Sequence, residues 1–155
     1  MQVKIYTDGA ARGNPDGPGG YGTVLEYVDS KGELHTKEIS QGYQRTTNNR
    51  MELTAAISAL SIVKNTPSFA RRKISVHIDS QYVKNGITVW IKGWKAKGWK
   101  TADKKPVKNQ DLWQLLDELN CSLDVSWNWV KGHSGVEYNE ICDQLCQKEI
   151  KKYSR

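Results

Sequence analysis

The chain has 155 residues, 37% of them hydrophobic and 26% charged, which is typical of a single folded domain over residues 1–155 and excludes a disordered chain. Lysine and arginine outnumber aspartate and glutamate by 23 to 17, so the formal net charge of +6 favours a polyanionic partner such as a nucleic acid. The sequence shows no leader-like start and no apolar run near the roughly 18 residues that cross a bilayer, so we expect a cytoplasmic protein.

The first predicted strand ends on a carboxylate and runs into a glycine-rich loop. Residues 3–8 alternate between two faces, as residues of a strand do, and Asp8 comes last. The loop over residues 13–20 is either a plain connection or a place where the backbone approaches a phosphate closely. Strands at residues 21–28 and 34–43 follow, and the short connections predict an antiparallel meander of three strands.

A helix is predicted to begin around residue 49, where apolar side chains start to recur with helical spacing. The apolar stripe consists of Leu53, Ala56, Ile57, Leu60 and Val63. The helix is expected to end before Pro67. Glu52 lies in its first turn, where a capping box with Asn49 explains this acid as well as a catalytic role does.

A second strand that ends on a carboxylate is predicted at residues 74–79. Asp79 ends this strand in the same phase as Asp8 ends the first one. A strand, a helix and a second strand form a right-handed crossover, so the two strands can lie parallel in one sheet. Because ligands gather at the carboxyl ends of such strands, the two carboxylates form a candidate site.

Residues 84–108 contain eight lysines, three tryptophans and a single acid, Asp103. A charge run is commonly a solvated face, and tryptophans four residues apart commonly belong to a core. Gly93 and Gly98 interrupt this segment, however, and few aliphatic residues accompany the tryptophans. The pattern therefore favours a basic protrusion that is stiffened by indole rings and follows a phosphate backbone.

The rest of the chain predicts a helix, a strand and a final helix. A short amphipathic helix is expected over residues 109–116 and a strand over residues 123–130. The last helix carries an apolar stripe made of Tyr138, Ile141, Cys142, Leu145 and Cys146. Its two cysteines are expected to line the buried face and not to bind metal. Asp143 lies at the edge of this stripe, where an acid is normally just solvated.

Five segments, in order and at family-like spacing, resemble type 1 ribonuclease H over nearly the whole chain. They are Tyr6-Thr7-Asp8-Gly9, Gly13-Asn14-Pro15 and residues 46–53, 79–83 and 129–133. The segment rich in lysine and tryptophan is similar to the basic handle of bacterial ribonuclease HI. The resemblance implies an α/β fold of the ribonuclease H type, in which helices flank a five-stranded mixed sheet of three antiparallel and two parallel strands.

This family hydrolyses the RNA strand of an RNA–DNA hybrid and leaves 5′-phosphate and 3′-hydroxyl ends. The resemblance implies a catalytic, metal-binding set of four carboxylates, which are Asp8, Glu52, Asp79 and Asp143. It makes His133 the histidine that assists proton movement or product release. Hard divalent ions suit oxygen ligands, so two Mg²⁺ ions, with Mn²⁺ as a substitute, are the expected cofactors.

The resemblance also implies which residues bind the hybrid duplex. The minor-groove and 2′-hydroxyl contacts are expected from Asn14, Asn49 and Gln81, and the contact to a DNA phosphate from Thr47. The DNA backbone is expected to be held by Trp90, Trp94, Lys95, Lys97 and Lys100. Asp16 is an insertion in the family's glycine loop, where it adds a negative charge. A monomer is the expected state.

Two other classes of function are open to this sequence. A catalytically silent module that binds hybrids or double-stranded RNA would lack one or more of the four acids, and all four are present. An integrase-type nuclease shares the fold and the acidic chemistry, but residues 47–52 and His133 argue against it.

Overall fold

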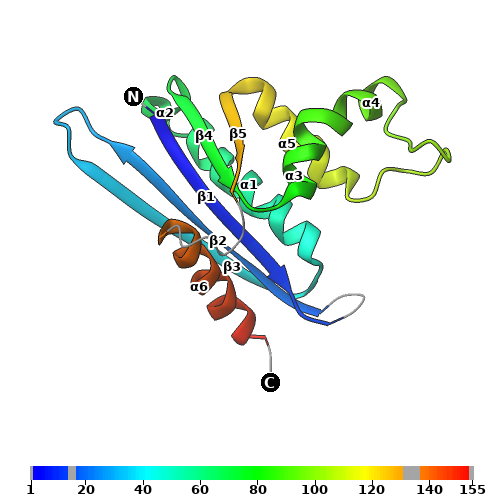
Figure 1. Ribbon diagram of the computed structural model, residues 1–155, viewed down its shortest axis with the longest axis horizontal. Helices are drawn as coiled ribbons and strands as arrows, with labels where there is room; N and C mark the ends of the chain where they lie inside the picture. The colour runs from blue at the N-terminus through cyan, green and yellow to red at the C-terminus, as the bar shows by residue number, and fades with distance from the viewer. Residues whose placement is uncertain (1, 14–16, 131–136, 154–155) are drawn as a thin grey trace.

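The computed structural model describes residues 2–13, 17–130 and 137–153, and these contain one mixed sheet of five strands (Figure 1). The antiparallel meander consists of β1 (Gln2–Ala11), β2 (Gly17–Val28) and β3 (Leu34–Thr46). The parallel strands on the other side of β1 are β4 (Lys73–Ile78) and β5 (Asp124–Trp129). The resulting order β3-β2-β1-β4-β5 confirms the predicted sheet of three antiparallel and two parallel strands.

The first two strands extend further than predicted, so the prediction of a loop at residues 17–20 is wrong. β1 continues past Asp8 to Ala11, which pairs with Gly19 of β2. A neighbouring helix fills the space beside Gly20 of β2, where a Cβ would lie 2.7 Å from the Cβ of Glu149, whereas the adjacent strands crowd Gly19, where a Cβ would lie 2.8 Å from the carbonyl oxygen of Ala10. Packing against that helix and pairing with the adjacent strands hold this glycine-rich segment extended, which local propensity alone does not predict.

The main core lies between one face of the sheet and helix α1 (Asn48–Lys64). Four residues of the predicted stripe are fully buried there, namely Leu53, Ala56, Leu60 and Val63. Ile57 of the same stripe is only partly buried. The helix ends before Pro67, as predicted, and this proline begins the short helix α2 (Pro67–Ala70).

Helix α6 (Glu137–Lys151) covers the opposite face of the sheet. Tyr6 neighbours Ile5 in β1, so their side chains point to opposite faces, and Tyr6 packs with Cys142 of α6. The thiols of Cys142 and Cys146 donate hydrogen bonds to backbone oxygens of β1 and β2, at 3.2 and 3.1 Å respectively. Both cysteines are buried, which confirms the predicted apolar face of this helix.

The chain between β4 and β5 forms α3 (Gln81–Asn85), a wider π-helical turn (Gly86–Trp90), α4 (Ile91–Ala96) and α5 (Gln110–Ser122). In Figure 1, α4 and the chain that follows it reach beyond α3 and α5 at one end of the molecule. Trp94 packs against Trp113 of α5 with 5.2 Å between ring centroids, and Trp99 packs against Trp94 at 6.3 Å. These two tryptophans therefore extend the core into the protrusion, whereas Trp90 is 40% exposed. None of the helices in the described part of the chain is long and apolar enough to cross a membrane.

Candidate active site

Asp8, Glu52 and Asp79 come from three different elements and meet at one end of the sheet. Each carboxylate offers one oxygen, and the three oxygens lie within 4.8 Å of one another. β1 and β4 are parallel and Thr7 is paired with Ile78. The residues that follow them, Asp8 and Asp79, therefore present their carboxylates at the same edge of the sheet. The predicted side-by-side placement of Asp8 and Asp79 is confirmed.

Glu52 reaches the two aspartates because Gly9 allows α1 to lie directly against β1. A Cβ on Gly9 would lie 2.5 Å from the carbonyl carbon of Met51, so a larger residue would push the helix away. The amide of Gly9 donates hydrogen bonds to Asp8 Oδ1 at 2.9 Å and to Glu52 Oε1 at 3.2 Å. One backbone donor thus holds both carboxylates in place.

The capping-box explanation of Glu52 is wrong. Thr47 is the N-cap residue of α1, and its Oγ1 accepts a hydrogen bond from the amide of Arg50 at 3.2 Å. Glu52 is only 9% exposed, and its Oε2 accepts no hydrogen bond from any residue that the structure describes. A buried carboxylate oxygen without a protein donor is one that a cation can satisfy.

Asp143 joins the site from α6, which packs closely on β2. Gly22 lies opposite Asp8 in the sheet, and a Cβ on Gly22 would lie 2.4 Å from the carbonyl oxygen of Cys142. This close approach brings the residue after Cys142 near Asp8, so that the Asp143 carboxylate raises the pKa of Asp8. The structure therefore brings all four predicted acids together.

The acids of this site resist losing their protons. Burial, followed by the charges of Asp79 and Asp143, raises the pKa of Asp8 to about 7. Burial and the same kind of repulsion, from Asp79 and Asp8, raise the pKa of Glu52 well above its ordinary value. Like charges confined in a dry site favour a bound cation, and a donor set made only of carboxylate oxygens suits a hard divalent ion.

Polar residues predicted to contact substrate lie beside the acids. Asn49 is exposed in the first turn of α1, three residues before Glu52. Gln81 is exposed at the start of α3, two residues after Asp79. Thr47 is partly buried as the N-cap of α1. All three lie at the start of a helix, in sequence segments that also contain Glu52 or Asp79.

The lysines predicted to contact substrate are all exposed, but their surroundings differ. Lys95 forms an ion pair with Asp117 of α5, with 3.0 Å between Nζ and Oδ2. Lys97 and Lys100 instead line an open hollow, together with Thr101, Ala102 and Lys104. Three of the five residues that line this hollow are therefore lysines.

Asn14 and His133 lie outside the described residues, as does Asp16, so their predicted roles stay predictions. Two residues that support the site were not predicted from the sequence. Asn48 accepts the amide of Ala11 through its side-chain Oδ1, and Trp129 donates its indole N–H to the backbone oxygen of Asp79 at 3.2 Å. Both residues lie in family-like segments, Asn48 in 46–53 and Trp129 in 129–133, but neither segment alone indicates these hydrogen bonds.

A second group of possible metal ligands lies at the turn between β2 and β3 and is already occupied by internal contacts. Asp29 Oδ1 accepts hydrogen bonds from the amides of Lys31 and Glu33, at 2.8 and 2.9 Å. Its Oδ2 lies 2.7 Å from Nε2 of His35. This group organises the turn, so the cluster around Asp8 is the candidate active site.

Comparison with known proteins gives consistent matches. The family model for RNase H matches residues 1–151. Ribonuclease H of Pseudoalteromonas atlantica is 55% identical over 145 residues, which cover 94% of this chain and 88% of that protein. Ribonuclease HI of Caulobacter vibrioides is 54% identical over 151 residues, which cover 97% of this chain and 94% of that protein.

Two solved structures resemble the whole fold. LC9-RNase H1 has a TM-score of 0.87 at 30% identity, covering 99% of this chain and 74% of that chain. LC11-RNase H1, whose crystal structure is in complex with an RNA/DNA hybrid, has a TM-score of 0.69 at 25% identity and 97% coverage of both chains.

Proposed function

The chain belongs to the ribonuclease H family, and from this premise we propose that its reaction is carried out by four acids, Asp8, Glu52, Asp79 and Asp143. The protein is a metal-dependent hydrolase that cleaves the RNA strand of RNA–DNA hybrids. The observation that supports the assignment of the acids is the convergence of three carboxylates, one buried (Glu52) and two half-buried (Asp8 and Asp79), whose oxygens lie within 4.8 Å of one another. A site of this kind needs a cation before all of its acids can ionise.

We propose two Mg²⁺ ions as the physiological cofactors, with Mn²⁺ as a substitute. Asp8, Glu52 and Asp79 would hold them together with Asp143, since all four supply oxygen ligands. When bound, such ions activate a water molecule as the nucleophile and stabilise the charge that develops on the leaving 3′ oxygen. The amide of Gly9 orients Asp8 and Glu52 for this purpose through its two hydrogen bonds.

Recognition of the hybrid is proposed to rest on two surfaces. The RNA strand would be read at its 2′-hydroxyls by Asn49 and Gln81, which flank the acids, and by Asn14. Thr47 would contact a DNA phosphate. The protrusion would hold the DNA backbone through Lys97, Lys100 and the exposed indole of Trp90, with smaller contributions from Trp94 and Lys95.

His133 is proposed to assist proton movement or product release. We further propose that residues 1–155 act as one domain and as a monomer. A cytoplasmic location is proposed as well, since Cys142 and Cys146 are buried free thiols that donate hydrogen bonds, as is usual for proteins in a reducing compartment.

One incubation series tests the proposed function. End-labelled RNA–DNA hybrid, single-stranded RNA and duplex DNA are each incubated with the protein, in Mg²⁺ and in Mg²⁺ with excess chelator. We expect cleavage of the RNA in the hybrid alone, abolished by the chelator because the acids cannot share the site without a cation. Cleavage that persists in chelator would contradict the metal assignment.

A substitution in the same series separates catalysis from binding. Asp79→Asn keeps the shape of the side chain but removes one negative ligand, so we expect turnover to fall below detection while hybrid binding by gel shift persists. Equal loss of binding and turnover would assign Asp79 a structural role. Binding by the wild type without any metal-dependent cutting would indicate a silent binding module.

A further inference from the structure

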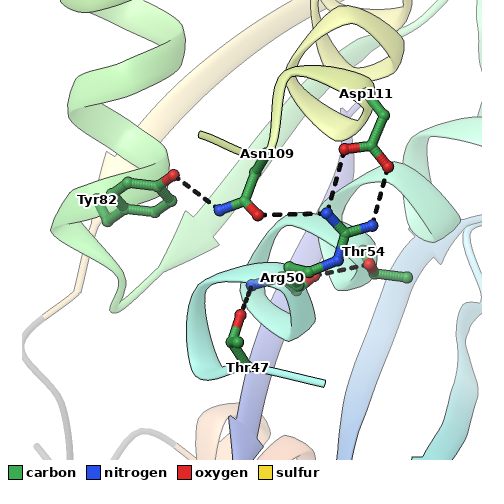
Figure 2. Close-up of polar contacts among 6 residues, drawn as sticks. All are labelled: Thr47, Arg50, Thr54, Tyr82, Asn109 and Asp111. Carbon is green, nitrogen blue, oxygen red and sulfur yellow. Dashed lines mark hydrogen bonds and ion pairs between the residues drawn. The ribbon is translucent and has the colours of Figure 1, made fainter. Parts of the chain in front are cut away.

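Arg50 lies between the proposed substrate residue Asn49 and the acid Glu52 in the sequence, and its side chain reaches the start of α5. Figure 2 shows its guanidinium between Asn109 and Asp111. Its Nη1 donates to Asn109 Oδ1 at 3.2 Å and to Asp111 Oδ1 at 3.1 Å, and its Nη2 donates to Asp111 Oδ2 at 2.9 Å. The two parallel bonds to Asp111 fix both the distance and the orientation of the guanidinium.

The contact continues from Asn109 to Tyr82 in α3. Asn109 uses both ends of its amide, because its Nδ2 donates to Tyr82 Oη at 3.1 Å while its Oδ1 accepts from Arg50. Tyr82 Oη also accepts the indole N–H of Trp113 at 3.2 Å. Tyr82 directly follows Gln81, so one chain of hydrogen bonds joins the starts of α1, α3 and α5.

Asn109 is suited to this junction by its backbone as well as by its side chain. Its φ of 60° lies in the left-handed region, which asparagine tolerates better than most residues. It is the last residue before α5, at the point where the chain returns from the protrusion. The junction therefore lies at the base of the surface that carries Lys97 and Lys100.

The ion pair in this chain is partly open to solvent. The Arg50 side chain is 37% exposed and that of Asp111 is 63% exposed. The hydrogen bonds to Asp111 raise the pKa of Arg50, and those from Arg50 lower the pKa of Asp111, so both stay charged at neutral pH. Exposed pairs of this kind contribute little to stability, and their bidentate geometry mainly sets the relative position of two helices.

We propose that Arg50 is a positioning residue that fixes the protrusion relative to the residues flanking the acids. This rests on the proposed roles of Thr47, Asn49 and the lysines Lys97 and Lys100 in binding the hybrid. If the two surfaces are held at one separation, a hybrid that spans both binds without first ordering them. Arg50 touches neither strand and acts through Asn109 and Asp111.

The proposal predicts an effect on KM that depends on the length of the hybrid. The test uses hybrids of increasing length. KM is first measured for the double variant Lys97→Ala/Lys100→Ala, and the longest hybrid whose KM the double substitution leaves unchanged is taken as the short hybrid. The short hybrid reaches only the acids and the residues that flank them, whereas longer hybrids also reach Lys97 and Lys100. We expect Arg50→Lys and Asp111→Asn each to raise KM about fivefold on long hybrids, with kcat unchanged and no effect on the short hybrid.

Arg72→Lys is the matched control. Arg72 is another partly buried arginine, which donates to the backbone oxygen of Val28 at 3.0 Å at the end of the sheet away from the acids. Replacing it removes an arginine-specific contact without touching the chain from Arg50 to Tyr82, so KM should be the same at every length. Asp111 is exposed, so Asp111→Asn tests the proposal even if Arg50→Lys folds poorly.

Three outcomes would overturn the proposal. An equal change of KM on short and long hybrids would show a general structural role. A higher KM for Arg50→Lys with a lower KM for Asp111→Asn would show that Arg50 itself binds a phosphate, since removing the acid would then free the guanidinium. Failure of wild type to cut hybrids of any length would overturn the proposed function as well. The wild-type rate identifies this outcome, because the other two outcomes both require that wild type cuts hybrids.

Discussion

Asp8 and Glu52 lie where a negative charge is unfavourable, and this property of single residues sets the chemistry of the site. Burial is the first cause of the raised pKa of each, and the charges of neighbouring carboxylates follow it. The fixed donor that they share is the amide of Gly9. Such an arrangement disfavours ionisation of the acids in the absence of metal, so it favours binding of a cation.

The raised pKa of Asp8, about 7, predicts how stability depends on pH when metal is absent. Unfolded Asp8 releases its proton near pH 4, whereas folded Asp8 keeps it up to about pH 7, so the folded state binds more protons between these values. Stability is then fully present below about pH 4 and falls as pH rises through 7. Asp8→Asn removes this loss of stability. In chelator, the free energy of unfolding of the variant should therefore exceed that of wild type by about 2–4 kcal/mol at pH 8, and the two should be equal below pH 4.

Urea unfolding at the two pH values measures this difference. Glu118→Gln, which removes an exposed acid of α5, is the control and should show no such pH dependence. Excess Mg²⁺ should narrow or reverse the difference at pH 8, because the ion stabilises the wild-type site alone. A constant difference between Asp8→Asn and wild type at all pH values would contradict the cause given for the shift.

Two close approaches between elements assemble the acids. Gly9 lets α1 lie against β1, and Gly22 lets α6 lie against β2, and in both places a Cβ would come within 2.5 Å of a backbone atom of the helix. The acids Glu52 and Asp143 each lie one residue after the contacted helix residue. The distance between strand and helix therefore decides whether the carboxylates meet.

Gly9→Ala should disturb the site more than it disturbs the fold. Its Cβ would lie 2.5 Å from the Met51 carbonyl carbon, so α1 must shift and carry Glu52 with it. We expect a decrease of about 1–3 kcal/mol in unfolding free energy and a fall in kcat on the order of 10- to 100-fold.

Gly93→Ala in α4 is the matched control for Gly9→Ala. A Cβ at Gly93 meets nothing within 4 Å and its backbone is helical, so kcat should be unchanged and stability should rise by up to about 1 kcal/mol. Steady-state kinetics and urea unfolding measure both effects. Equal kcat for Gly9→Ala and wild type would contradict the positional role of this close approach.

The molecule as a whole separates its charges. The acids Asp8, Glu52 and Asp79 converge at one edge of the sheet. Lys97, Lys100 and Lys104 lie in the segment after α4, which Figure 1 shows reaching beyond α3 and α5. The net charge of +6 favours a polyanionic partner, and three lysines (Lys97, Lys100 and Lys104) line one hollow of the protrusion. Lys95 contributes less to this field, because Asp117 already neutralises it.

Salt dependence tests this division of charge. Lys97→Ala/Lys100→Ala should raise KM for a long hybrid and lower the slope of log KM against log salt by about 1 for each phosphate that a lysine no longer neutralises. Lys95→Ala should change the slope less, since its partner Asp117 offsets its charge. Lys37→Ala/Lys73→Ala removes the same charge from exposed positions of β3 and β4, outside the protrusion, and should leave the slope unchanged. Equal slopes for all variants would mean that the protrusion is only a solvated surface.

The sequence by itself determined the elements whose pattern is local. Alternation identified β1 and β4 and placed Asp8 and Asp79 in the same phase, and helical spacing identified the buried stripe of α1. The family motifs identified Glu52 and Asp143, which neither period nor spacing distinguished from ordinary solvated or capping acids. Asn14 and His133 stay predictions from those motifs.

Only the tertiary structure decided what depends on contacts between distant segments. Gly20 and Gly22 stay in β2 because α6 packs on them, and Glu52 accepts a hydrogen bond from Gly9 instead of capping its own helix. The pairing of Lys95 with Asp117 and the reach of Arg50 to α5 likewise join residues far apart in the chain. Periodicity reports which face of one element is buried, but the distance between two elements is set by the side chains packed between them.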